Sequence, residues 1–204
     1  EDSFDITFLE ETSYYDSDDY FHLVGELQND SDINLNIAII AAFYDIDGNV
    51  LDADNLSMMP ISSLAPGETV TYDISNWKSL NNNEGLFDTV DNYSVQWDPG
   101  WTWDTSARYV DIATIDEGSE YDEFWGTTFT GNVENDSGEN LAGAVVIVNL
   151  YDPESGALLA MGYETIFDEI PDGEVTDYEV IVPVEADFDL DAVEHTIIAK
   201  GKMP

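Results

Sequence analysis

An internal repeat is the feature that most constrains the fold of this chain. The heptapeptide GELQNDS at residues 25–31 returns as GNVENDS at residues 131–137, an offset of 106 residues. The segment LAPGETVTY at 64–72 returns as IPDGEVTDY at 170–178 with the same offset. Self-similarity of this kind predicts two copies of one domain.

Period-two hydrophobic patterns within each copy predict β-strands. The segment NLNIAIIAAFYDI at 34–46 alternates apolar side chains on one face, and the runs at 70–74 and 93–97 are also typical of strands. We therefore expect an all-β chain of two tandem immunoglobulin-like or fibronectin-III-like β-sandwich domains, residues 1–100 and 101–204. The linker between them is short, so we expect the two copies to touch.

The charge of the chain is extreme. Its 45 Asp and Glu residues, scattered along the sequence, face only 4 Lys and Arg residues, which gives a formal net charge of −41. Such a surface excludes nucleic acid as a partner, because it cannot neutralise phosphates. In about 1 M salt the Debye length is only roughly 3 Å, so the self-repulsion of the surface is screened. We interpret the chain as a halophilic protein from an extreme halophile; the alternative is an acidic secreted protein that binds calcium.

The sequence also bears on the compartment of the protein. It has no cysteine, so we expect neither disulfides nor thiol chemistry. No apolar run reaches the length of about 18 residues that a membrane span needs. The chain begins at Glu1 without methionine, and we expect a leader or a lipid-carrying anchor to have been removed. These features predict an extracellular or cell-surface protein.

The segment FYDIDGNVLD at 43–52 resembles a metal loop, because Asp45, Asp47 and Asn49 alternate around a glycine. An EF-hand loop, however, needs glycine at its sixth position and glutamate at its twelfth, and this segment has neither. Asp, Asn and Gly also supply the positive φ of hairpin turns. We predict a hairpin turn here, and keep Asp45 and Asp47 as candidate ligands for weakly bound Na⁺, K⁺ or Ca²⁺.

The repeated motifs resemble the FxLYD domain family. The residues that carry the resemblance are Gly25, Leu27 and Asn29, Phe43-Tyr44-Asp45 and LAPGE at 64–68 in the first copy, and GNVEN at 131–135, LYD at 150–152 and IPDGE at 170–174 in the second. The chain departs from the family pattern at Ala41 and Val148, which replace the naming Phe, and at Asp172, which replaces the turn proline. The resemblance implies an immunoglobulin-like sandwich on secreted or surface proteins, and it implies no catalytic residues.

Catalytic chemistry has little support in the sequence. His22 and His195 are the two histidines of the chain, and each lies in a strand pattern where a structural role is expected. Among 45 acids no pair stands out as a glycosidase site, and no glycine-rich loop ends in lysine to hold a phosphate. We therefore expect no enzyme activity and no cofactor.

Three tryptophans lie near the junction of the two copies. We expect Trp97, Trp101 and Trp103 to pack the copies together, in preference to stacking on a sugar.

Four Asn-x-Ser/Thr sequons are candidate glycosylation sites. They begin at Asn29, Asn55, Asn92 and Asn135, and they mildly favour an extracellular surface.

These observations predict a non-catalytic protein-interaction or spacer module that works at the cell surface in high salt, binding a protein partner or associating with itself. The alternative is a structural subunit of a surface filament, pilus-like fibre or coat, assembled by contacts between domains or by strand addition at sheet edges.

Overall fold

The computed structural model describes residues 4–18, 20–54, 59–76, 90–98, 102–122, 126–184 and 188–204. In this part of the chain the fold is all-β, with several sheets and a single helical turn, the 3₁₀ segment η2 (Leu190–Ala192). None of its helical segments has the length and apolar character of a membrane span. The all-β class expected from the strand patterns is confirmed.

The first repeat forms two three-stranded antiparallel sheets, which are ordered β1-β2-β6 and β5-β4-β7. Their strands are β1 (Ile6–Tyr15), β2 (Phe21–Asn29), β4 (Ile39–Tyr44), β5 (Val50–Asp54), β6 (Thr69–Asn76) and β7 (Asn92–Trp97). A short pair, β3 (Leu35–Asn36) with β8 (Trp103–Asp104), brings the segment after β7 back along the first repeat. The start of the predicted second domain is therefore still bonded to the first repeat.

The second repeat forms a six-stranded sheet in the order β12-β11-β14-β9-β10-β13. Its strands are β9 (Tyr109–Asp122), β10 (Gly126–Glu134), β11 (Gly143–Tyr151), β12 (Leu158–Ile166), β13 (Val175–Val182) and β14 (Glu194–Lys202). The long strand β9 joins the two halves of this sheet. Its residues 109–112 pair with β14, and its residues 113–122 pair with β10.

The pairing register repeats with the offset seen in the sequence. Gly25 lies opposite Tyr72, and Gly131 lies opposite Tyr178. A Cβ atom on Gly25 would come within 2.5 Å of the Tyr72 hydroxyl, and one on Gly131 within 2.7 Å of the Tyr178 hydroxyl. The tyrosine ring covers the facing glycine in both repeats, and this close approach is the physical reason for the glycine of the repeated motif.

The buried apolar residues of both repeats form one core cluster. In the first, Leu23 and Leu27 are fully buried, and the rings of Phe21 and Phe43 meet edge to face with centroids 5.5 Å apart. In the second, all but the last residue of β11 is buried. A strand that is buried on both faces needs cover on both sides, which the neighbouring repeat supplies.

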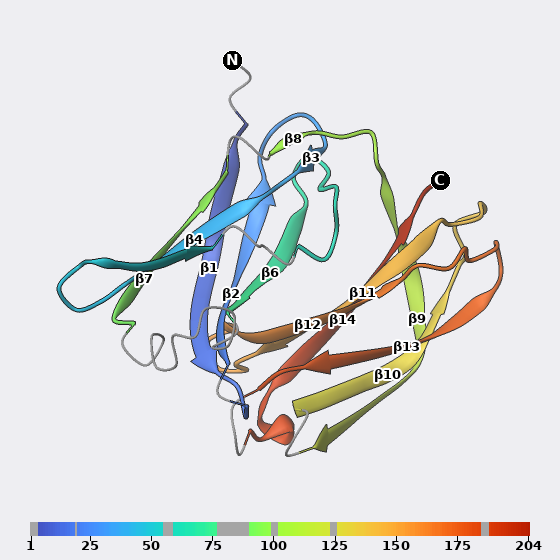
Figure 1. The fold of residues 1–204 in the computed structure, drawn as a ribbon. Helices are drawn as coiled ribbons and strands as arrows, with labels where there is room; N and C mark the ends of the chain where they lie inside the picture. The colour runs from blue at the N-terminus through green and yellow to red at the C-terminus, as the bar shows by residue number, and fades with distance from the viewer. Residues whose placement is uncertain are drawn as a thin grey trace.

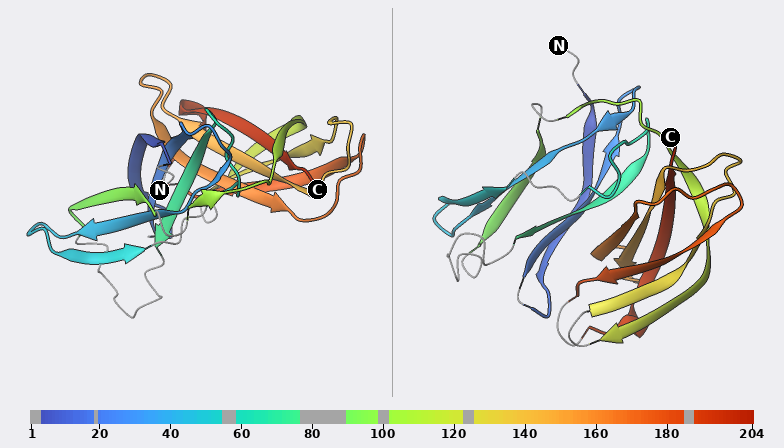
Figure 2. Two further views of the ribbon diagram at one scale, coloured as in Figure 1. Left: turned by 90° about the horizontal axis from the view of Figure 1, so that it is seen from above. Right: turned by 45° about the vertical axis from the view of Figure 1, so that its right-hand side comes forward.

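The two repeats pack sheet against sheet. Strand β12 of the second repeat contacts β1, β2 and β6 of the first. In Figure 1 the strands of the first repeat, in blue and cyan, lie beside the orange and red strands of the second, and Figure 2 shows the same arrangement from two other directions. Residues of the first repeat that would face solvent in a single sandwich, such as Val24, are therefore buried.

Candidate functional site

The segment that resembles a metal loop is a hairpin turn between β4 and β5. The Asp45 carboxylate accepts hydrogen bonds from the Asp47 and Asn49 backbone nitrogens at 2.9 and 2.8 Å and from the Asn49 side-chain nitrogen at 2.8 Å. The hydrogen bond from the Asn49 side chain is the main cause that lowers the pKa of Asp45. Gly48 has a φ of 79°, the left-handed conformation such a turn requires. The oxygens of Asp45 thus satisfy the turn itself.

The same device closes the equivalent turn of the second repeat. Asp152 accepts from the backbone nitrogens of Glu154 and Ser155 at 3.0 and 2.7 Å, and Gly156 has a φ of 75°. Across the part of the chain that the structure describes, no three His, Asp or Glu side chains are grouped as a metal would need. The turn that we predicted is present in both repeats, and Asp45 and Asp47 acquire no further ligand.

Two of the predicted glycosylation sites have a structural role. Asn29 and Asn135 are 0% exposed. The Asn29 side-chain nitrogen donates to the carbonyl oxygens of Ile33 and Leu64 at 2.8 and 2.9 Å. The Asn135 side-chain nitrogen donates to those of Glu139 and Ile170, both at 2.8 Å. The glycan prediction is corrected at these two positions, because the nitrogen that a glycan would modify is buried and bonded in the folded chain.

The other two sequons differ from this pair. Asn92 lies exposed at the start of β7, and its side-chain oxygen accepts from the Tyr93 backbone nitrogen at 2.8 Å. Asn55 lies outside the described residues. The candidacy of Asn92 as a glycosylation site stays a prediction.

The two described tryptophans of the predicted junction lie on strands of the first repeat. Trp97 lies in β7 and meets the ring of Phe4, also of the first repeat, at a centroid distance of 6.1 Å. Trp103 lies in β8 and is 47% exposed. Trp101 lies outside the described residues. The pairing of β8 with β3 holds Trp103 on the first repeat, and the packing of the copies by these tryptophans stays a prediction.

Polar side chains join the repeats instead. The Lys200 ammonium of β14 binds the Glu68 carboxylate of the first repeat, and it lies 2.9 Å from the Asp111 carboxylate. Burial lowers the pKa of Lys200, but the two carboxylates outweigh it and raise the pKa above its ordinary value. One of the four basic residues of the chain is thus committed to the contact between the repeats.

A second link uses the tyrosine of the LYD motif. The Tyr151 hydroxyl donates to the Glu26 carboxylate of the first repeat at 2.9 Å, and burial with this nearby charge raises the pKa of Tyr151 to about 12. Thr71 of the first repeat donates to the Asn149 side-chain oxygen at 2.9 Å. In the first repeat the equivalent residue, Tyr44, shares an exposed hydrogen bond with Ser94. The same motif position therefore joins the repeats in one copy and bonds within its own repeat in the other.

A buried histidine, His22, lies on the face of the sheet β1-β2-β6 that contacts the second repeat, here called the docked face, and it has the structural position in a strand that the sequence predicts. His22 is 4% exposed, and its ring nitrogens lie 2.8 Å from the Asp73 carboxylate and 3.3 Å from the Asp16 carboxylate. Its ring stacks on that of Tyr14 at 5.0 Å, and the Tyr14 hydroxyl donates to the Pro183 carbonyl of the second repeat at 2.9 Å. The two ring nitrogens face different carboxylates, so the group forms a chain of hydrogen bonds and no common ligand position.

His22 and Asp73 shift each other's pKa. Burial alone lowers the pKa of His22, but the hydrogen bond and charge of Asp73, followed by those of Asp16, raise it above its ordinary value. Burial raises the pKa of Asp73, and His22 opposes this shift. One oxygen of Asp73, Oδ1, has no hydrogen-bond partner among the described residues. The cluster is a buried chain of hydrogen bonds beside the second repeat, and its geometry suits a structural contact.

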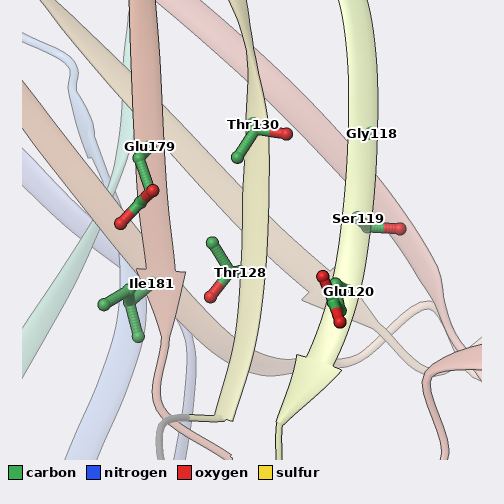
Figure 3. A pocket seen from close by; sticks show the side chains of 7 residues that line it. All are labelled: Gly118, Ser119, Glu120, Thr128, Thr130, Glu179 and Ile181. Carbon is green, nitrogen blue, oxygen red and sulfur yellow. The ribbon is translucent and has the colours of Figure 1, made fainter.

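The matching face of the second repeat is open. The outer face of β9, β10 and β13 is a shallow depression of about 750 Å³, in which Glu120 lies on β9, Thr128 and Thr130 on β10 and Glu179 on β13 (Figure 3). By the offset of 106 residues these positions correspond to Tyr14, His22, Val24 and Asp73 of the first repeat. The second repeat thus exposes the face that the first repeat buries.

Comparisons with known proteins add little to this picture. No protein-family model matches the chain, and no curated protein matches it. Among solved structures, the chain is similar to red sea bream transglutaminase with 10% sequence identity, over 96% of this chain and 30% of that chain, at a TM-score of 0.28. The chain therefore spans less than a third of that protein, and a likeness this weak carries no argument about fold or activity.

Proposed function

We propose that this chain is a non-catalytic protein-interaction or spacer module, extracellular or anchored at the cell surface, that is adapted to high salt. The FxLYD resemblance of its repeated motifs supports a surface role. The function is argued from the contacts between the repeats, because an all-β sandwich by itself specifies none.

The observation that carries this proposal is the polar contact between the two repeats. Lys200 bound to Glu68, and Tyr151 bound to Glu26, fix the second repeat on the first at two separate points. Partly buried charge-assisted bonds of this kind hold a defined geometry better than exposed pairs do. A stiff pair of sandwiches is a suitable spacer, and it presents the surfaces of both repeats in a constant relation to a partner.

The distribution of charge supports the high-salt part of the proposal. With 45 acids and 4 basic residues, attraction between opposite charges cannot offset the repulsion of the surface. At multimolar salt this repulsion is screened within a few Å, or roughly 3 Å at 1 M. The pair between Lys200 and Glu68 is sheltered from that screening, because both side chains are largely buried. The contact between the repeats therefore works in the solvent that the surface requires.

A surface filament is the second candidate, and the open face of the second repeat favours it. In a head-to-tail array this face would receive the sheet β5-β4-β7 of the next molecule, since that sheet is the counterpart of β12-β11-β14. The charges oppose such a contact, because Glu179 replaces Asp73 and Thr128 replaces His22, so this acid has no histidine beside it. We rank the single module first for this reason.

Size-exclusion chromatography with light scattering tests the proposal, with KCl stepped from about 0.1 M, where the Debye length is roughly 10 Å, to above 2 M. A folded monomer at high salt that loses compactness at low salt is the expected result. Ordered assemblies at high salt would replace the module by the filament. A compact monomer that is unchanged at low salt would refute the halophilic part.

A further inference from the structure

A small pocket lies where the two repeats meet. It has a volume of about 240 Å³. Met59 and Pro60 of the first repeat form one wall, and Val145, Ile166 and Phe167 of the second repeat form the other. Pockets at junctions between domains are common binding sites. This pocket exists only while the repeats are docked.

The walls of this junction pocket carry no acid. In a chain with 45 Asp and Glu residues, none of the residues that line it is acidic. The two other described pockets both lie on the outer face of the second repeat, and acids such as Glu120 or Asp177 line each of them. The junction pocket is thus an apolar and acid-free place on a strongly acidic molecule, and a local exception of this kind marks an interaction site.

The shape of the pocket is fixed by bonds in its rim. The hydroxyl oxygens of Ser62 and Tyr109 lie 3.1 Å apart across the junction. Gly143 at its base has a φ of 149°, and a Cβ atom there would come within 2.4 Å of the Ile166 carbonyl oxygen. Only glycine fits this position, so the two strands approach closely and the base stays open. A pocket that is formed in advance costs a ligand little ordering.

The side chains at the mouth indicate the chemistry of the occupant. Phe167 is 86% exposed and is one of the residues that line the pocket. Lys202 lines the same pocket and is exposed, and no ion pair joins it to another described residue. An apolar group can fill the pocket and cover Phe167, while a negative charge beside that group can bind the lysine.

The volume restricts the size of that apolar group. It exceeds the cavity of about 150 Å³ that holds benzene, and it is below the range of about 300–1,000 Å³ that is typical of sites for larger ligands. We infer that the junction pocket receives one aromatic or branched aliphatic side chain of a partner protein, and that a carboxylate next to this side chain pairs with Lys202. The inference rests on the proposed function and names the chemistry of its partner.

A matched set of small probes tests this inference in about 2 M KCl, where long-range charge effects are screened. The probes are 3-phenylpropionate, 3-phenylpropylamine and propionate, which separate the contribution of the ring from that of the charge. Binding is followed by amide shifts in two-dimensional NMR of the whole chain. We expect 3-phenylpropionate to shift the amides of Ala142 and Phe167, with a Kd of the order of millimolar for so small a ligand.

Two variants and a control locate the binding. Ala142 is exposed at the pocket, so Ala142→Trp should occlude it without disturbing the core and should abolish the shifts. Lys202→Glu should weaken 3-phenylpropionate about fivefold, as expected for an exposed charge contact. Ile181→Trp places the same ring on the outer face of the second repeat and should leave binding unchanged.

The inference is overturned if the ring-bearing acid causes no shifts at the pocket, or if the amine binds as well as the acid does. Equal binding to the Lys202→Glu variant would overturn the carboxylate partner. These failures are distinct from a failure of the proposed function, which the chromatography decides without any probe. A monomer that folds in high salt and ignores 3-phenylpropionate would keep the module and remove only this site.

Discussion

Replacing Asn135 by alanine tests whether the repeated Asn-x-Ser motif is structural. The side chain is fully buried and takes part in four hydrogen bonds. It donates to the carbonyl oxygens of Glu139 and Ile170, both at 2.8 Å, and accepts from the backbone nitrogen and hydroxyl of Ser137, at 3.1 and 2.7 Å. At about 1 kcal/mol net for each bond, we expect Asn135→Ala to lower the free energy of unfolding by roughly 4 kcal/mol.

Ser137→Ala is the matched control, because it destroys the same sequon and leaves the amide in place. It removes one hydroxyl donor, whose acceptors are the Asn135 side-chain oxygen at 2.7 Å and the Glu139 carbonyl at 3.1 Å. Because Ser137 is partly exposed, we expect a loss of only about 1 kcal/mol. Asn135→Asp should be at least as damaging as Asn135→Ala, because it turns a carboxylate oxygen toward two buried carbonyl oxygens.

The assay is urea unfolding in multimolar KCl, followed by tryptophan fluorescence and circular dichroism. Urea is preferred to guanidinium chloride because it leaves the ionic strength constant. The reasoning is refuted if Asn135→Ala costs less than about 1 kcal/mol, the value of a single bond, or if it costs the same as Ser137→Ala. Equal costs would mean that the sequon, and not the buried amide, is what matters.

Three further predictions concern other contacts of the fold. Because the pKa of His22 is raised in the folded chain, the stabilisation by its charge is present below the ordinary pKa of 6.5 and is lost as pH rises through the folded pKa. The free energy of unfolding should therefore fall above about pH 6.5. His22→Gln should remove this fall in urea titrations at several pH values. Lys200→Gln should cost about 2 kcal/mol, between the values for exposed and buried ion pairs, and should widen the distance distribution in small-angle X-ray scattering. Gly131→Ala should cost several times the roughly 1 kcal/mol of an ordinary Gly–Ala difference, because the Tyr178 ring must move, and a cost below that value in thermal unfolding would contradict the close packing.

The strands could be predicted because the same alternating pattern occurs in both repeats. The alternating pattern of residues 34–46 predicted β4, and the offset of 106 residues recurs in the pairing of β2 with β6 and of β10 with β13. The turn at Asp45 could be predicted because the hydrogen bonds that close it lie within five residues. These features depend on interactions that are short in sequence or are duplicated in it.

The role of Asn29 and Asn135 was missed for a different reason. A sequon and a buried turn residue share the pattern Asn-x-Ser, because the serine that follows binds the asparagine side chain in both repeats, through its backbone nitrogen at 3.0 and 3.1 Å. The partners that decide between the two roles, the carbonyls of Leu64 and Ile170, lie 35 residues away. A local motif cannot report such a distant contact. The signal available in the sequence was the recurrence of both asparagines at equivalent positions, which favours a role in the fold over a modification.

The strand patterns also could not predict the contact between the repeats. The sequence indicates this contact only where equivalent positions of the two repeats hold different residues. Equivalent positions on the outer faces hold Tyr14 and Glu120, His22 and Thr128, and Val24 and Thr130. In each pair the residue of the first repeat is aromatic, apolar or able to pair with a buried acid, whereas that of the second is a solvated polar residue. If both faces were exposed, the same solvent would act on both, and nothing would select for the difference. Burial of one face and exposure of the other require this difference in polarity. In this tandem repeat, the positions where the two copies differ in polarity therefore identify the docked face.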